Sequence, residues 1–213
     1  MEELLPKIHA ISGFIILLTG LLQVVMKKSG RAHRFIGRVY AWSWVPLIAT
    51  GAIIGSFIIT FFGLLGFYMV FTGFRFAHLK HVRLSFFDKG FIVLFFLIGL
   101  TCLGSGFYIL WLGSILFAII TLFFGVIFTL TTTQDILEFI LGKKTRKTSG
   151  HHMHWYFEHY NRMYISFIAA VTAFSALQNL LGHPLLNWIL PTIIGSVLIA
   201  LTNKNYRSKY KIE

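Results

Sequence analysis

Long apolar stretches alternate with short polar segments along the whole chain. A helix needs about 20 apolar residues, each rising 1.5 Å, to cross the hydrocarbon core of a bilayer. Seven stretches of roughly this length are predicted as spans, at about residues 8–26, 33–57, 60–78, 89–109, 112–134, 163–181 and 186–203. The pattern predicts an all-α integral membrane bundle of seven transmembrane helices, with residues 1–213 as a single polytopic domain.

Two boundaries are set by weaker signals. The apolar run from Val39 to Ala77 is far too long for one crossing, so we expect a hairpin within it, near Ile59 to Gly63. Residues 151–162 form a polar amphipathic segment, and we predict that the sixth span begins after it, at about Met163.

The basic residues predict the orientation of these spans. Eighteen of the nineteen Lys and Arg residues fall in four clusters, which follow the first, third, fifth and seventh predicted spans, and only Lys7 stands apart. The connections after the second, fourth and sixth spans carry none. Because Lys and Arg near spans mark the cytoplasmic side, the N-terminus is predicted outside and the C-terminus in the cytoplasm. The expected protein therefore crosses the membrane several times.

Composition agrees with a membrane protein. The chain is 56% hydrophobic and 12% charged, whereas soluble domains are roughly 25% charged. A net charge of +12 could suggest nucleic-acid binding, but the basic residues lie at span ends and form no continuous patch. We therefore expect no nucleic acid, and expect the lipid bilayer and its anionic headgroups as partners. The single cysteine, Cys102, excludes an intramolecular disulfide and a thiolate cluster.

Histidines are the main candidates for cofactor binding. Imidazole suits zinc, copper or haem iron, so the sequence is compatible with haem b or a divalent metal. Acidic residues predicted at the same depth could add ligands or orient the imidazoles; these are Asp88, Asp135, Glu138 and Glu158. The candidate cofactor ligands near the cytoplasmic face are His33, His78, His81, His154 and His159, with His9 as a sixth close to the outer face.

The same histidines also allow a simpler interpretation, in which they contact lipid phosphates and cap helix ends. No H-E-x-x-H motif is present. A conduit with two haems would need paired ligands in both layers, and the outer layer offers only His9 and His183. A single haem near the cytoplasmic face remains compatible with the sequence.

Three arginines stand out. Arg34 and Arg38 share a helix face with Arg31. They could contact a headgroup or phosphate, pair with Asp135 or Glu158, or extend toward the membrane surface as topology signals. Arg75 lies inside the predicted third span and requires an acidic partner, for which we predict Asp135 at the end of the fifth span. Such an ion pair could be structural or could bind a ligand.

Three segments resemble a family of uncharacterised bacterial inner-membrane proteins defined as a domain of unknown function. They are His9 with His33–Tyr40, then Phe71–Arg75, and then Ile168–Phe174 with Trp188–Gly195. Before its sixth span the chain has His159-Tyr160-Asn161-Arg162-Met163, where the family pattern leads us to expect His-Ile or His-x-x-Met. The resemblance implies a polytopic fold, a multi-pass location in the bacterial cytoplasmic (inner) membrane, and no particular activity.

Two functional hypotheses follow. The first is a membrane protein that binds haem or a metal through histidines near the cytoplasmic face. The alternative is a cofactor-free small-molecule transporter or membrane-assembly protein, with a water-filled pocket near Arg75 and Asp135. The sequence indicates no catalytic residue, substrate or protein partner.

Overall fold

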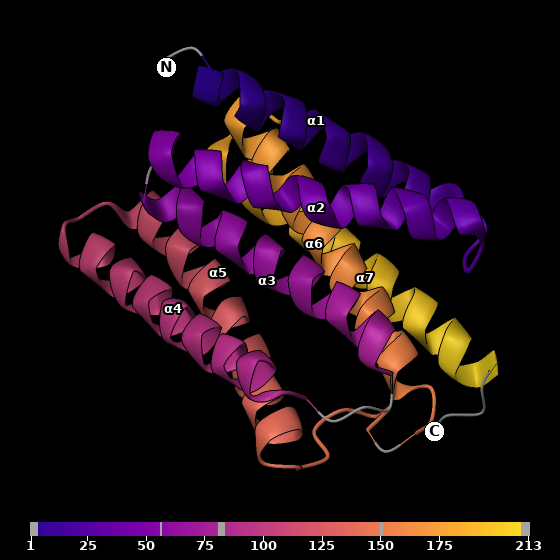
Figure 1. Ribbon diagram of the computed structural model, residues 1–213. Helices are drawn as coiled ribbons and strands as arrows, with labels where there is room; N and C mark the ends of the chain where they lie inside the picture. The colour runs from indigo at the N-terminus through magenta and orange to yellow at the C-terminus, as the bar shows by residue number, and fades with distance from the viewer. Residues whose placement is uncertain (1–3, 56, 81–83, 150, 210–213) are drawn as a thin grey trace.

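The computed structural model describes residues 4–55, 57–80, 84–149 and 151–209 (Figure 1). The described residues are almost entirely helical, with a short π-helical turn, Ile136–Ile140, that continues the fifth helix. The seven α-helices are α1 (Leu4–Val25), α2 (Arg31–Ile54), α3 (Phe57–Leu79), α4 (Phe86–Trp111), α5 (Ile115–Asp135), α6 (His154–Gln178) and α7 (Pro184–Lys209).

The all-α prediction is confirmed, and each predicted span corresponds to one helix, but two boundaries were wrong. The turn between α2 and α3 falls at Gly55, not at Ile59 to Gly63. Gly55 donates its backbone N–H to Gly51 O at 2.7 Å, and a Cβ there would meet that oxygen at 2.5 Å. The sixth helix begins earlier than the predicted start at about Met163, because α6 starts at His154 and includes most of the polar segment.

Five helical segments of the described chain are long and apolar enough to cross a membrane. They are Leu4–Val25, Ile59–Leu79, Phe86–Trp111, Ile115–Ile140 and Pro184–Ser208. Large apolar side chains face outward on them, among them Phe14 of α1, Phe107 of α4 and Val197 of α7. Polar groups such as Thr121 and Asp135 lie inside. Apolar side chains outside and polar ones inside are the arrangement that a lipid solvent favours.

Helix α3 lies in the middle of the bundle (Figure 1). It packs along α6, while α1 pairs with α2 and α4 pairs with α5. Small residues allow the close approach of α3: a Cβ on Gly66 would clash with Trp44 of α2 at 2.3 Å, and one on Gly73 would lie 2.9 Å from Arg162 Cβ of α6. These contacts set the rotation of α3 against both neighbours.

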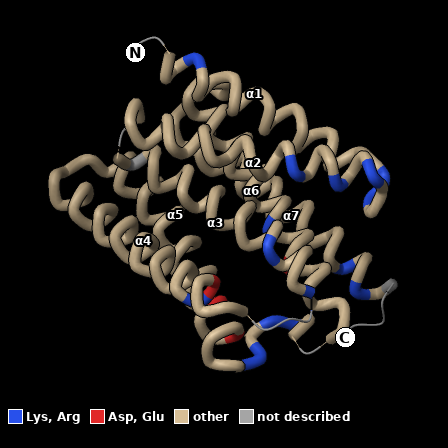
Figure 2. Tube along the Cα trace, in the orientation of Figure 1, with Lys and Arg blue, Asp and Glu red and all other residues tan. Residues whose placement is uncertain are grey.

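The C-terminal ends of α1, α3, α5 and α7 lie toward the same end of the bundle (Figure 1). Most Lys and Arg positions gather there, and the acidic residues of the described chain lie among them (Figure 2). This basic end holds a cavity and a buried ion-pair network.

Candidate ligand cavity and buried ion-pair network

A cavity of about 520 Å³ opens between α1, α2, α3 and α6 at the basic end. Small-molecule sites commonly have volumes of about 300–1,000 Å³, so this one can hold a ligand of ordinary size. None of the described residues that line it is acidic. The cationic side chains that line it are Lys28, Arg34, Arg38 and Lys80. The cavity is therefore suited to a ligand that carries negative charge.

Helix α6 gives the cavity an aromatic wall. Tyr156, Tyr160 and Tyr164 follow one another at four-residue spacing and therefore share one face of the helix. Trp155 and Phe167 extend this wall, and Phe74 of α3 adds a further ring to the lining. The cavity thus combines cations with apolar rings, which suits a ligand that has both an anionic group and an apolar body.

The cavity arginines have no acidic partner among the residues that the structure describes. Arg34 and Arg38 lie about one turn apart on α2, are exposed, and form no ion pair with a carboxylate of the described chain. Their guanidinium groups keep five N–H donors each for other partners.

The cavity lysines are held by local contacts. Lys28 donates from Nζ to the carbonyl oxygens of Gln23 and, at 3.2 Å, Val24, near the C-terminal end of α1. Partial burial of its ammonium lowers the pKa of Lys28. Lys80 Nζ lies 5.3 Å from the ring centroid of Trp155, within range of a cation–π interaction. Both cations remain without a carboxylate among the described residues.

Three of the predicted cofactor histidines line this cavity: His33 from α2, His78 from α3 and His159 from α6. His159 Nδ1 is 2.8 Å from Gly73 O, and His78 Nδ1 is 2.9 Å from Phe74 O. A carbonyl oxygen can only accept, so Nδ1 carries the proton in both rings and the neutral imidazole keeps its lone pair on Nε2. His33 Nδ1 is buried without a hydrogen-bond partner in the described structure.

The other predicted histidines lie elsewhere. His154 bonds Thr148 Oγ1 through Nδ1 at 2.9 Å, and its Nε2 approaches Glu138 Oε1 to 3.3 Å without hydrogen-bonding geometry. His9 Nδ1 lies 3.1 Å from Leu47 O, so it ties α1 to α2 at the end of α1 away from the cavity. His81 falls outside the described residues. The four described histidines that were predicted near the cytoplasmic face therefore do not form one group.

Within the described part of the chain, no three His, Cys, Asp or Glu side chains gather closely enough to hold a metal ion. A bare divalent metal held by protein ligands alone, as in zinc sites with three or four of them, therefore has no support in these residues.

A buried ion-pair network lies beside the cavity. Its centre is Arg162 of α6, whose side chain is 3% exposed. It forms a two-pronged pair with Asp135 of α5, with Nη2 at 2.6 Å from Oδ1 and Nη1 at 2.8 Å from Oδ2. Nε and Nη2 also donate to Glu158 Oε2, and Nη1 donates to Thr72 Oγ1 of α3 at 2.9 Å. All five donors of Arg162 are thus used, and α3, α5 and α6 are joined.

Arg146 joins the connection between α5 and α6 to this network. Its guanidinium pairs with Asp135, with Glu138 of the π-helical turn, and with Glu158, whose Oε1 is 3.3 Å from Nε. Burial opposes the charge, but the carboxylates of Glu158 and Asp135 outweigh it and raise the pKa of Arg146. Arg146 therefore anchors the connection to the end of the bundle through three carboxylates.

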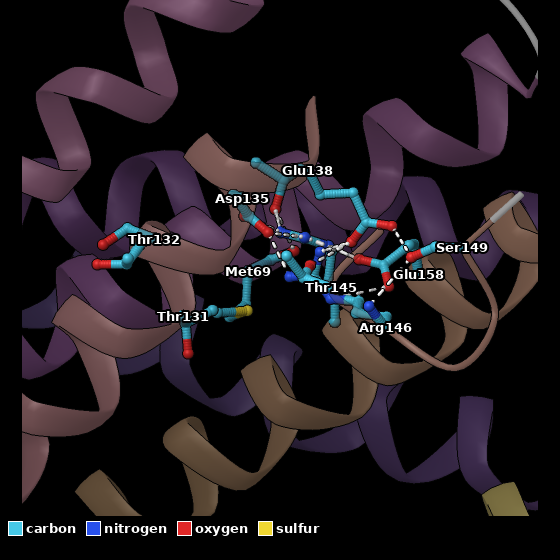
Figure 3. A network of polar contacts seen from close by, with 12 residues as sticks. Met69, Thr131, Thr132, Asp135, Glu138, Thr145, Arg146, Ser149 and Glu158 are labelled. Atoms are coloured by element: carbon cyan, nitrogen blue, oxygen red, sulfur yellow. Dashed lines mark hydrogen bonds and ion pairs between the residues drawn. The ribbon is translucent and has the colours of Figure 1, made fainter. Parts of the chain in front are cut away.

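Figure 3 shows Asp135, Glu138 and Glu158 converging on Arg146, with Ser149 beside Glu138. Ser149 donates its hydroxyl to Glu138 Oε1 and accepts the backbone N–H of Arg146 at 3.0 Å. Tyr68 of α3 donates to Asp135 Oδ2. Every carboxylate of this cluster has donors, as buried charge requires.

The predicted pair between Arg75 and Asp135 is not formed. Arg75 donates to both oxygens of Asp88, with Nε 2.7 Å from Oδ1 and Nη2 3.2 Å from Oδ2. Asp88 also caps the start of α4 with Ser85 in a reciprocal capping box. Arg75 and Asp88 are only 13 residues apart, so the end of α3 is joined to the start of α4. Asp135 faces α6 and takes Arg162 in its place.

No family model, curated protein or solved structure matches the chain.

Several important residues were missed from the sequence. Arg162 and Arg146 were counted only as members of a basic cluster, although Glu158 and Arg162 have the i, i+4 spacing of a helical ion pair. Neither Arg75 nor Asp135 lines the cavity. The predicted phosphate contacts Arg34 and Arg38 do line it, together with Lys28 and Lys80, which had no predicted role.

Proposed function

We propose that this chain is a seven-span protein of the bacterial cytoplasmic membrane that binds an amphipathic anion in the cavity between α1, α2, α3 and α6. Five apolar helices support the membrane location. The remaining two, α2 and α6, are 24 and 25 residues long, which at 1.5 Å per residue is enough to cross the hydrocarbon. The gathering of Lys and Arg at one end supports a cytoplasmic C-terminus and an outer N-terminus (Figure 2).

The observation that carries the proposed function is the set of unpaired cations in the cavity. Arg34 and Arg38 have no carboxylate partner in the described chain, whereas Arg162 and Arg146 beside them are fully paired. Charge left unpaired against an aromatic wall suits a ligand with an anionic head and an apolar body.

The cavity lies at the basic end of the bundle, so its ligand could come from either of two sources. Basic pockets between helices on the cytoplasmic side of a membrane bind anionic headgroups, so a phospholipid could enter from the bilayer. A free amphipathic carboxylate could enter from the cytoplasm. Both share the chemistry that the cavity recognises, and the experiment below separates them. The cofactor-free transporter and the resemblance to the uncharacterised inner-membrane family remain predictions.

The test is ligand binding to purified full-length protein in neutral detergent, followed by native mass spectrometry. The probes are dioleoylphosphatidylglycerol, oleate, and dioleoylphosphatidylcholine as the zwitterionic control. We expect one bound anion, and about tenfold or greater weakening in the double variant Arg34→Gln/Arg38→Gln, since a charge-assisted hydrogen bond contributes about 1.5–3 kcal/mol.

The matched control is Lys143→Gln/Lys144→Gln, which removes the same charge from exposed positions at the basic end but outside the cavity. If both double variants bind the anion equally weakly, the loss of affinity comes from the overall charge of the surface, and the proposal is wrong. Equal binding of the zwitterionic lipid would also overturn it. Preference for phosphatidylglycerol over oleate, or the reverse, identifies the source of the ligand.

A further inference from the structure

The three imidazoles of the cavity are not explained by anion binding alone. His159 and His78 each donate Nδ1–H to a backbone carbonyl and keep Nε2 as an acceptor. Histidines that bind metals almost always have this arrangement, in which the second ring nitrogen donates to a carbonyl or carboxylate that fixes the ring. His33 adds a buried Nδ1 with no partner in the described structure. The cavity therefore offers metal-binding nitrogens as well as positive charge.

The described residues do not hold a bare metal ion, but they suit a metal that brings its own ligands. No three His, Cys, Asp or Glu side chains of the described chain gather around one point. Haem iron already has four ring nitrogens and needs only one or two axial ligands from the protein. The porphyrin is also an amphipathic anion, with two carboxylates and an apolar ring.

We propose that the cavity binds haem b, with His159 Nε2 as an axial ligand of the iron, the basic side chains near the haem carboxylates, and the tyrosine wall of α6 along the ring. This proposal rests on the proposed function, since haem is one member of the ligand class named there. It adds a metal-binding role that a phospholipid or a fatty acid does not require.

The network beside the cavity holds His159 in place. His159 donates to Gly73 O, and the preceding residue of α3, Thr72, accepts from Arg162 at 2.9 Å. A Cβ on Gly73 would lie 2.9 Å from Arg162 Cβ and 3.3 Å from Met163 Sδ, so a side chain there would push α3 away from α6. Glycine at this position brings the carbonyl within reach of the imidazole. Arg162 is thus a positioning residue for His159.

The first measurement uses the unaltered protein, purified in detergent and titrated with haemin, iron-free protoporphyrin IX and dioleoylphosphatidylglycerol. We expect saturable binding of one haemin, an absorbance spectrum of histidine-ligated haem, and clearly weaker binding of protoporphyrin IX. Equal affinity for haemin and protoporphyrin IX would show that the iron makes no bond to the protein and would overturn the haem proposal. No variant is needed for this comparison.

The second measurement replaces the ligand. We expect His159→Ala to weaken haemin binding by at least about tenfold. Loss of a residue that only hydrogen-bonds to a metal ligand already weakens metal binding by about 10- to 100-fold, and His159 would be the ligand itself. Added imidazole should restore the spectrum by filling the space. His152→Ala is the matched control, because His152 is exposed and does not line the cavity. Unchanged haemin binding in His159→Ala, or the same loss in both variants, would identify adventitious haem and overturn the proposal.

The two proposals fail in different ways. If phosphatidylglycerol or oleate binds with the expected dependence on Arg34 and Arg38 while haemin gives no saturable spectrum, the haem proposal is wrong and the proposed function stands. If none of the anions binds in an Arg34- and Arg38-dependent manner, both are wrong.

Discussion

Two groups of cations lie at the basic end of the bundle, and they differ in their partners. Arg162 and Arg146 are surrounded by Asp135, Glu138 and Glu158. The cations of the cavity have no carboxylate from the described chain and face aromatic rings. The two groups come from the same basic end of the bundle, so the overall charge of that end does not distinguish them.

This difference in partners indicates a structural role for the paired arginines and a binding role for the cations of the cavity. A buried pair contributes little net stability by itself, but removal of one partner leaves an unpaired charge and is strongly destabilising. The paired arginines therefore hold α3, α5 and α6 together. An unpaired cation near the surface can be changed at little cost to folding, and its donors remain available to a ligand. The predictions below test this division.

The largest expected effect is on Arg162. Arg162→Met leaves the Asp135 and Glu158 carboxylates buried with too few donors, so we expect a loss of about 3–5 kcal/mol in the free energy of unfolding. The measurement is unfolding by SDS in mixed micelles. Arg38→Met is the control, because it makes the same substitution in the cavity. It should change this free energy by no more than about 0.5 kcal/mol.

A second variant makes this prediction sharper. Arg162→Met/Asp135→Asn removes both charges of the central pair, so part of the lost stability should return, while Arg146 keeps Glu138 and Glu158. If Arg38→Met destabilises the protein as much as Arg162→Met does, the division between paired and unpaired cations is wrong.

A smaller effect is expected for Arg146, which anchors the connection between α5 and α6. Arg146→Met should cost about 1.5–3 kcal/mol, the contribution of hydrogen bonds to charged groups, and should act locally. Hydrogen exchange should become faster in residues 141–149 and stay unchanged in α3. Lys147→Met is the control, since Lys147 is exposed in the same connection. Equal acceleration in both variants would show that Arg146 is not the anchor.

The sequence predicted the helices well because apolar length is a local property. It misplaced the turn after α2, because the run from Val39 to Ala77 contains no charged residue before Arg75 to mark a break. The break depends on Gly55, which makes a close backbone contact with Gly51 O. Such a contact has no signal in hydropathy.

The site was harder to predict because partners depend on helix rotation. An ion pair between Arg75 and Asp135 was predicted because both were expected at the same depth in the membrane. Arg75 instead faces Asp88 at the start of α4, and Asp135 faces α6. Similarly, depth placed five histidines together, whereas the packing of α2, α3 and α6 brings His33, His78 and His159 around one cavity. The i, i+4 spacing of Glu158 and Arg162 was the one local signal of the network.

The smallest expected effect concerns Lys28 and pH. Burial lowers the pKa of Lys28, so its ammonium loses charge at a lower pH than an ordinary lysine with a pKa of 10.5. As the pH rises toward that value, the affinity of the cavity for phosphatidylglycerol should fall about two- to fivefold, because one cation of the lining is lost while Arg34 and Arg38 stay charged. Lys28→Arg keeps the charge, so the variant should retain more of its affinity over the same range. If the two proteins show the same pH dependence, Lys28 does not contact the anion, and the cations that bind it are among Arg34, Arg38 and Lys80.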